Sequence, residues 1–414
     1  MPAPPPPRDR LPERLRSRFR ASGGLPREVY VLGLIAFCVA VGFGVLVPVL
    51  PVFARSFGVD NFAVGAVVSA FAALRLVTSP FCGRLIDRFG ERLVMAVGIF
   101  IVAASSGVAG ISQTYEQLLV LRGIGGVGSA MFTVSATTLL LTSVEAGLRG
   151  RAAGFFQGGF LLGGMTGPAI GGVLSAIALR APFFFYAGTL AVAGAVGLVL
   201  LRVRSERGDA PVLPVVPFRQ VLRDKRYQAA CVTNLAQGWT SFGVRSTLVP
   251  VLVVEVLQRP TSWTGIAFAV AAVAQTLAVG PAGRFVDTVG GRPAMIAGGV
   301  LAGLSILAVP FAPGIGLLIV ALSLYGVAAA FLGTAPAASV GDAAGGRGGT
   351  AVAVFSMCAD VGAIVGPLVA GLLADSFSYP VAFAVGAALL LVGAGASARM
   401  PRTAPVEEDR APAR

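Results

Sequence analysis

The sequence predicts an all-α membrane protein with twelve transmembrane helices in two six-helix, pseudo-symmetric halves. Three observations support this prediction: an apolar composition, long apolar segments along nearly the whole chain, and short motifs that recur about 200 residues apart. Of the 414 residues, 56% are hydrophobic and only 12% are charged, and the mean hydropathy is +0.83. A soluble protein normally carries about 25% charged residues. Apolar segments of about 20 residues are typical of helices that cross a bilayer.

Twelve candidate spans follow one another along the chain. They cover residues 30–54, 62–85, 93–112, 117–142, 151–178, 181–201, 228–255, 262–284, 294–312, 315–338, 350–374 and 378–398. A polar, basic segment divides the spans six and six. The predicted parts are an N-terminal tail (1–28), an N-terminal half (29–201), a central loop (202–227), a C-terminal half (228–398) and a C-terminal tail (399–414).

Basic residues orient these spans, because the cytoplasmic loops of membrane proteins carry an excess of Arg and Lys. One set of connections holds Arg88, Arg92, Arg149, Arg151, seven basic residues from Arg202 to Arg226, Arg292 and Arg347; the opposite set holds only Arg55, Arg180 and Arg259. We therefore expect both termini and the central loop in the cytoplasm, and the chain in the cytoplasmic (inner) membrane.

The net charge of +13 follows this pattern, which argues against nucleic-acid binding. We expect no signal peptide in the proline-rich N-terminus, and residues 11–20 are candidates for a short basic helix on the membrane surface.

Two motifs repeat at nearly the same spacing. The segment GRLIDRFGERLV begins at Gly83 and returns, altered, as GRFVDTVGGRP at Gly283, 200 residues later. The segment GMTGPAIGG around Pro168 returns as AIVGPLVAG around Pro367, an offset of 199. Two signals at one offset indicate two halves of common design, as in transporters whose substrate site lies between parallel repeats.

The first motif resembles the G-x-L-x-D-x-x-G-R-[RK] signature of the major facilitator superfamily. The matching residues are Gly83, Asp87, Arg88, Gly90 and Arg92 between spans two and three, and Gly283, Asp287, Gly290 and Arg292 between spans eight and nine. Thr288 replaces a basic residue in the second copy. The resemblance implies a charged loop that holds the cytoplasmic side closed in one state. A stop-transfer loop with positive-inside arginines is the alternative.

The second motif resembles the G-x-x-x-G-P-x-x-G-G signature of the drug:proton antiporter branch of that superfamily. It comprises Gly163, Gly167, Pro168, Gly171 and Gly172, echoed by Gly362, Gly366, Pro367 and Gly371. Small residues at these spacings let helices pack closely, and ordinary helix packing is the alternative interpretation. Exporters of this branch often carry a carboxylate in span one. Residues 30–54 contain none, which leaves the coupling mechanism open.

Charged residues inside the spans are candidate functional groups, because burying a charge in a bilayer is costly. Asp360 is the acidic residue that we place at mid-membrane depth, and the chain contains no histidine to carry a proton. Arg75 lies ~15 Å and Asp360 ~16 Å from the cytoplasmic ends of spans two and eleven, at ~1.5 Å per residue. In the superfamily fold that the motifs resemble, spans two and eleven face each other, so we expect the two residues to meet across the boundary between the halves. The contact is either a pair that breaks when Asp360 takes up a proton or a permanent structural pair.

Arg122 and Arg245 lie in the outer parts of spans four and seven. Each is expected either to meet an anionic substrate or to pair with Glu255 or Asp60. In the superfamily fold, spans one, four, seven and ten line the cavity. The predicted lining residues are therefore Phe37, Phe43, Arg122, Phe132, Asn234, Gln237, Trp239, Phe242, Arg245 and Tyr325. This mostly apolar, aromatic set suits a lipophilic substrate.

No nucleophile constellation, phosphate loop or metal-ligand spacing occurs in the sequence, so we predict no enzyme, cofactor or metal site. The predicted function is proton-coupled efflux of small lipophilic, drug-like compounds by alternating access in a bacterial membrane. The predicted partners are the substrate, protons and the lipid bilayer, and a monomer suffices. The alternative is a facilitator or symporter for a sugar, organic acid or amino acid. A non-transporting sensor or scaffold on the same fold is a more distant alternative.

Overall fold

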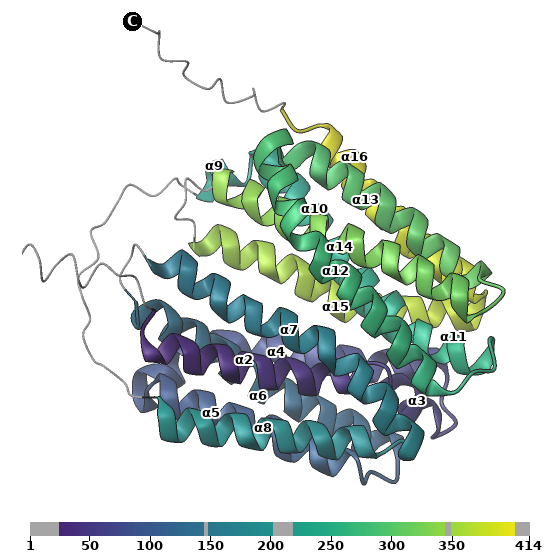
Figure 1. Cartoon of the computed structure of the whole chain (residues 1–414), viewed down its shortest axis with the longest axis horizontal. Coiled ribbons are helices and arrows are strands. Elements are labelled where there is room, and N and C mark those ends of the chain that lie inside the picture. Colours follow the sequence, from purple (N-terminus) through teal and green to yellow (C-terminus); the bar gives the residue numbers. More distant parts are fainter. Residues whose placement is uncertain (1–24, 145–147, 202–217, 344–348, 402–414) are drawn as a thin grey trace, which may run out of the picture.

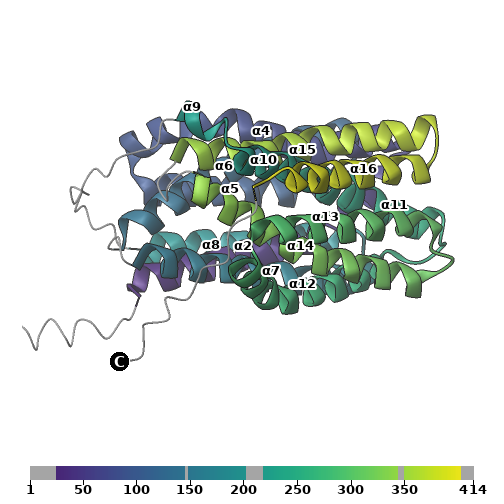
Figure 2. The same ribbon diagram turned by 90° about the horizontal axis from the view of Figure 1, so that it is seen from above.

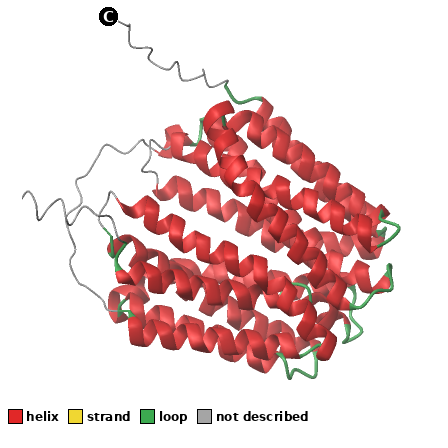
Figure 3. Cartoon of the chain, viewed as in Figure 1, coloured by secondary structure: helices red, strands yellow, loops and turns green. Residues whose placement is uncertain are grey.

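The computed structural model describes residues 25–144, 148–201, 218–343 and 349–401, and these residues are helical with short connections (Figure 3). The predicted all-α class is confirmed. The expected surface helix at 11–20 and most of the tails and central loop lie outside the described residues. The first group of helices is α2 (Arg27–Leu46), α3 (Leu50–Arg55), α4 (Asn61–Phe89), α5 (Glu91–Ala109), α6 (Tyr115–Thr142), α7 (Arg149–Ile177) and α8 (Ala181–Leu200).

The second group begins with the short helix α9 (Phe218–Val221) and ends at Ala398. Its further members are α10 (Lys225–Gly238), the π-helix η2 (Trp239–Leu248), α11 (Val249–Glu255), α12 (Thr261–Val289), α13 (Gly291–Ala308), the 3₁₀ turn η3 (Val309–Phe311), α14 (Ile315–Ala343), α15 (Gly349–Ser376) and α16 (Tyr379–Ala398). Purple to teal helices occupy the lower part of Figure 1, and green to yellow helices the upper part. Separate apolar cores lie in the two groups, around residues such as Leu32 and Met95 in the first and Phe268 and Phe383 in the second.

Eleven of the described helices are long and apolar enough to cross a membrane. The remaining predicted span, 228–255, is built from α10, η2 and α11 in succession. Pro250 lies just after η2 and has no N–H to donate, which disfavours a regular α-helical turn. The hydroxyls of Ser246 and Thr247 instead reach the carbonyls of Ser241 and Phe242, five residues earlier, at 2.7 Å each. The widened turn carries Arg245, and π-helical segments are frequent at functional sites.

The first span is also interrupted. Residues 47–49 form a turn between α2 and α3, where we expected one helix over 30–54. Pro48 lies in this turn, and a proline inside a helix removes one hydrogen bond and clashes with the preceding turn. The short helix α3 therefore forms the last part of this span separately.

The two groups contact each other through α4 with α15 and through α7 with α12, which lie side by side in Figure 2. Glycines make the contact close. A β-carbon on Gly65 would collide with the backbone carbonyl of Pro367, and one on Gly265 would lie 2.5 Å from the Cα of Gly172. Backbones therefore meet with no side chain between them.

These backbone contacts lie at the end of the molecule where α4 and α12 begin, called here the closed end. At the opposite end, called the open end, no described atom lies within 4 Å of a β-carbon placed on Gly83, Gly154, Gly158 or Gly280. These four glycines lie on α4, α7 and α12, the helices that touch the other group further along. The two groups therefore join at one end and separate at the other.

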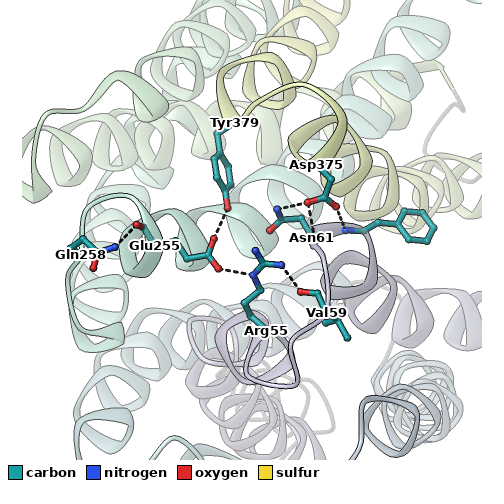
Figure 4. A network of polar contacts seen from close by, with 8 residues as sticks. Arg55, Val59, Asn61, Glu255, Gln258, Asp375 and Tyr379 are labelled. Atoms are coloured by element: carbon teal, nitrogen blue, oxygen red, sulfur yellow. Dashed lines mark hydrogen bonds and ion pairs between the residues drawn. The ribbon is translucent and has the colours of Figure 1, made fainter.

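A carboxylate strengthens the closed end (Figure 4). Asp375, near the end of α15, accepts hydrogen bonds from the backbone N–H of Asn61 at 3.1 Å and of Phe62 at 2.8 Å. The side-chain amide of Asn61 donates to the same carboxylate at 2.7 Å. Asp375 thus caps the N-terminus of α4 from the other group, where the helix dipole favours negative charge.

A second link at the closed end joins equivalent positions of the two halves. Arg55 Nε lies 2.6 Å from Glu255 Oε1, and the two residues are 200 positions apart. Tyr379 donates to the other carboxylate oxygen of Glu255 at 3.3 Å. Residues related by a two-fold axis meet only close to that axis. The contact therefore indicates that the ends of spans one and seven lie beside the pseudo-symmetry axis.

The charged motif residues do not form the loop that we expected. Gly83 to Phe89 are the last turns of α4, and the second copy ends α12 in the same way. The connections shrink to Gly90 (φ 79°) and Gly290 (φ 106°), left-handed conformations that glycine adopts without strain. Asp87 and Asp287 are exposed at the open end and form no ion pair with another described residue.

We predict that Gly65→Leu forces the closed end apart, because its side chain needs the space that Pro367 occupies. Nitroxide labels at Gln113 and Phe377, both exposed at this end, would report the change as a longer label-to-label distance in double electron–electron resonance. The labelling sites would be introduced into a variant in which the four native cysteines are replaced by alanine. Gly188→Leu is the control, since no described atom lies near that position. An unchanged distance in Gly65→Leu would contradict the prediction.

We also predict that Asp375→Asn weakens the closed end without changing its shape. Loss of a charge at a helix N-terminus costs about 0.3–1 kcal/mol, which corresponds to about a two- to five-fold rise in the fraction of open molecules. The same label pair measures that fraction. Glu116→Gln removes a carboxylate on the same side that contacts no residue of the other group, and it should leave the fraction unchanged.

Candidate functional site

A cavity of about 820 Å³ lies between the two groups of helices. Its lining runs from Leu50 and Pro51 near the closed end to Gly154 and Val279 towards the open end. The helices α2, α4, α6 and α7 of the first group and η2, α12 and α14 of the second all contribute. The contacts at the closed end make it a blind pocket that is reached from the open end. Its volume suits a drug-sized molecule.

Half of the residues predicted to line the cavity do so. The predicted residues found in the lining are Phe43, Arg122, Phe132, Phe242 and Arg245. Aromatic side chains that contribute without having been predicted are Phe71, Phe160, Tyr186 and Phe268. The cavity is therefore aromatic over much of its surface, with contributions from both groups.

Phe37, Asn234, Gln237, Trp239 and Tyr325 were predicted in the lining and are not part of it. Asn234 donates instead to the backbone carbonyl of Phe355 at 2.8 Å and so ties α10 to α15. Tyr325 is fully buried, and its hydroxyl lies 3.0 Å from that of Ser241. Asn234 and Tyr325 lie on the correct spans but on faces that pack against a neighbouring helix. Assigning a residue to a span does not determine how the helix is rotated about its axis, and this rotation decides which residues face the cavity.

Polar residues of α7 and α12 line the cavity although spans five and eight were not expected to do so. Gln157, Gln275 and Thr276 are the clearest cases. A glutamine within an otherwise apolar span was a usable signal in the sequence, because an amide facing lipid leaves its hydrogen-bonding groups unsatisfied. These residues add hydrogen-bonding capacity to a mainly aromatic surface.

Arg75 and Asp360 form the contact expected from their matching depths and from the superfamily resemblance. Arg75 Nη2 donates to Asp360 Oδ1, which joins α4 to α15 across the boundary between the groups. The side chains are 31% and 22% exposed, and Arg75 lines the cavity. The ion pair thus lies beside the cavity, where water entering from the open end has access to it.

Arg122 and Arg245 lie against aromatic rings. The Arg122 guanidinium carbon is 4.5 Å from the ring centroid of Phe71, and that of Arg245 is 5.5 Å from Phe268 and 5.7 Å from Tyr325. Such cation–π contacts stabilise a desolvated cation by about 2 kcal/mol. The expected alternative partners are engaged elsewhere: Glu255 with Arg55, and Asp60 with the backbone N–H of Ala63 at 2.8 Å.

The glycine-proline motif packs one helix against two partners. Gly163, Gly167 and Gly171 of α7 face the backbone of α2, and the next residue, Gly172, faces α12 of the other group. In the second copy, Gly362 and Gly366 of α15 face α10 and η2, and Gly371 and Pro367 face α4. Each copy thus joins its helix to the first span of its own half and to a helix of the opposite half.

Two curated relatives match part of the chain. It is 31% identical to multidrug resistance protein 1 of Bacillus subtilis (strain 168) over 166 residues, 40% of this chain and 43% of that protein. It is 29% identical to the quinolone resistance protein NorA of Staphylococcus aureus (strain MRSA252) over 175 residues, 42% of this chain and 45% of that protein. The matched stretches therefore span less than half the length of either relative.

Solved structures share the fold at low identity. A bacterial homologue of the human lysosomal transporter Spinster, inward-facing and unoccupied, matches with a TM-score of 0.71 and 16% identity over 91% of this chain and 96% of that one. The nucleoside transporter NupG matches with a TM-score of 0.70 and 15% identity over 90% of this chain and 98% of that one. The family profile of the Major Facilitator Superfamily matches residues 32–272 and 238–414. With this profile across both halves and the same fold, the chain belongs to the Major Facilitator Superfamily, a family of membrane transporters.

Proposed function

We propose that this protein exports small lipophilic, drug-like compounds across the cytoplasmic membrane by alternating access, driven by inward proton movement. The observation that carries the proposal is the aromatic cavity between the halves, closed at one end and open at the other. A substrate bound there reaches the opposite side when the closed end separates and the open end joins. The multidrug and quinolone resistance relatives support this substrate class.

The direction of opening follows from charge. Among the described residues the closed end carries Arg55, Arg180 and Arg259, whereas the open end carries many more basic residues, including Arg84, Arg88, Arg92, Arg151, Arg219, Arg223, Lys225, Arg226, Arg284 and Arg292. By the positive-inside rule the open end faces the cytoplasm. The described state is then inward-facing, ready to take a compound from the cytoplasm or the inner leaflet. The exposed motif residues at this end would meet partners only after it closes.

Proton coupling is assigned to the Arg75–Asp360 pair. A charge pair across the boundary holds α4 against α15 while Asp360 is ionised. Protonation removes the negative charge, and the remaining hydrogen bond is weaker, so the halves separate there more easily. Protonation of Asp360 would thereby change the balance between the inward-facing and outward-facing states, which links proton binding to the conformational cycle.

A second candidate is a proton symporter for an organic acid. Its supporting observation is that the described residues lining the cavity include Arg75, Arg122 and Arg245 but no Asp or Glu. Protonating Asp360 would leave Arg75 without a counter-charge beside this cavity. A proton and an anion would then favour each other's binding, whereas an exchanger needs them to compete.

We predict that a transported compound dissipates the pH gradient of inside-out vesicles with an acid interior, and that Asp360→Asn reduces this response at least ten-fold. The panel comprises lipophilic cations, neutral antibiotics and organic acids, and the gradient is followed optically. Glu116→Gln, a carboxylate outside the cavity, is the control. Wild-type rates in both Asp360→Asn and Arg75→Gln would remove the pair from coupling. Glu255 would be the next carboxylate to test.

The sign of proton movement separates the two candidates. An aryl sulfonate, which cannot cross as a neutral acid, is added outside inside-out vesicles without a pH gradient. An exporter that exchanges it for protons makes the interior alkaline, whereas a symporter makes the interior acid. Vesicles without the protein provide the baseline. No pH change and no uptake with any compound of the panel would refute both transport proposals.

A further inference from the structure

Two arginines from opposite halves line the cavity near its closed end. Arg122 lies seven residues after the start of α6 at Tyr115, and Arg245 lies ten residues before Glu255, the end of α11. At 1.5 Å per residue these positions are about 11 Å and 15 Å from the closed end. Both residues belong to the lining. A molecule that enters from the open end therefore meets them last, at the bottom of the cavity.

Neither guanidinium has a hydrogen bond or ion pair with another described residue, and the Nε atoms of both are buried without a partner. Arg122 as a whole is only 4% exposed. A guanidinium offers five N–H donors in a fixed plane, and burying it without acceptors is unfavourable. The rings of Phe71, Phe268 and Tyr325 stabilise the positive charge through their π faces. These rings are poor acceptors for the N–H donors, which lie in the plane of the guanidinium.

The described part of the chain supplies no counter-charge at this place. Glu255 and Asp60 are engaged at the closed end, and Asp360 is bonded to Arg75. Among the described residues that line the cavity, the remaining polar side chains are neutral hydroxyls and amides, such as Ser246, Thr133 and Gln275. The bottom of the cavity is therefore positively charged and short of hydrogen-bond acceptors.

We infer that the substrate is an amphiphilic organic anion, whose carboxylate, sulfonate or phosphate group binds Arg122 and Arg245 while its apolar body lies against the aromatic lining. Arginine matches such groups because two parallel N–H donors face two oxygens. The inference rests on the proposed transport function, in either direction of proton coupling. It also disfavours lipophilic cations, which would bring positive charge towards two unpaired arginines.

The two arginines give the anion a part in the transport cycle. Arg122 belongs to the first half and Arg245 to the second, so an anion bound to both bridges the halves. It also removes the mutual repulsion of two like charges in a medium of low dielectric. Binding therefore holds the halves together around the bottom of the cavity, whereas an empty cavity retains the repulsion between the two arginines.

The test compares three fluorescent compounds that share one ring system: dansylglycine (anion), dansylglycinamide (neutral) and dansylcadaverine (cation). Purified protein is held in nanodiscs of phosphatidylcholine, whose zero net charge does not select among them, and empty nanodiscs give the background. We expect dansylglycine to bind at least ten-fold more tightly than dansylglycinamide. Arg122→Gln and Arg245→Gln should each weaken dansylglycine about ten-fold and change dansylglycinamide less than two-fold.

Two further variants keep the test decisive. Arg122→Lys retains the charge and should recover part of the lost affinity, and Arg180→Gln, an exposed arginine at the closed end, should behave as wild type. Unchanged dansylglycinamide binding shows that a variant is folded. The inference is overturned if dansylglycine fails to bind, binds no better than dansylglycinamide, or is unaffected in both glutamine variants. Anion binding without transport of any compound in vesicles would instead refute the proposed function alone.

Discussion

The direct contact of backbones at one end of the molecule is the constraint on which the rest of the structure depends. Gly65 meets the carbonyl of Pro367, and Gly172 meets Gly265, without side chains between the helices. Long, nearly straight helices that touch at one end and incline away from each other must separate at the other. The blind cavity, its opening and the exposure of the charged motif residues all follow from this geometry. A contact made of large interlocked side chains would be harder to separate and re-form.

Charge is distributed in three layers along this geometry. At the closed end the exposed carboxylates of Glu255 and Asp375 hold the halves together, and each link contributes modestly. At intermediate depth Arg75 and Asp360 form a pair across the boundary. Close to the bottom of the cavity Arg122 and Arg245 have aromatic neighbours and no described counter-charge. Chemically similar residues therefore differ in role from one layer to the next, because their partners and their access to water differ.

Some tertiary contacts were accessible from the sequence because a helix advances regularly. The Arg75–Asp360 contact followed from two distances along helices and from the resemblance to a superfamily in which spans two and eleven face each other. The Arg55–Glu255 contact was missed, although their separation of 200 equals the spacing of the motif copies and was a usable signal. The contact of Asp375 with Asn61 at the first turn of α4 carried no comparable signal. Neither residue belongs to a repeated motif, and both lie just outside the predicted apolar spans.

The sequence by itself determined the all-helical class, the repeated design of the two halves and the depth of each charged residue, because hydrophobic periodicity and helix rise are local properties. Only the tertiary structure decided which end is closed, which face of each helix lines the cavity, and that span seven widens into a π-helix around Arg245. These features depend on helix rotation and tilt. Rotation and tilt are set by packing between residues as far apart in the chain as Gly65 and Pro367, and no local pattern records them.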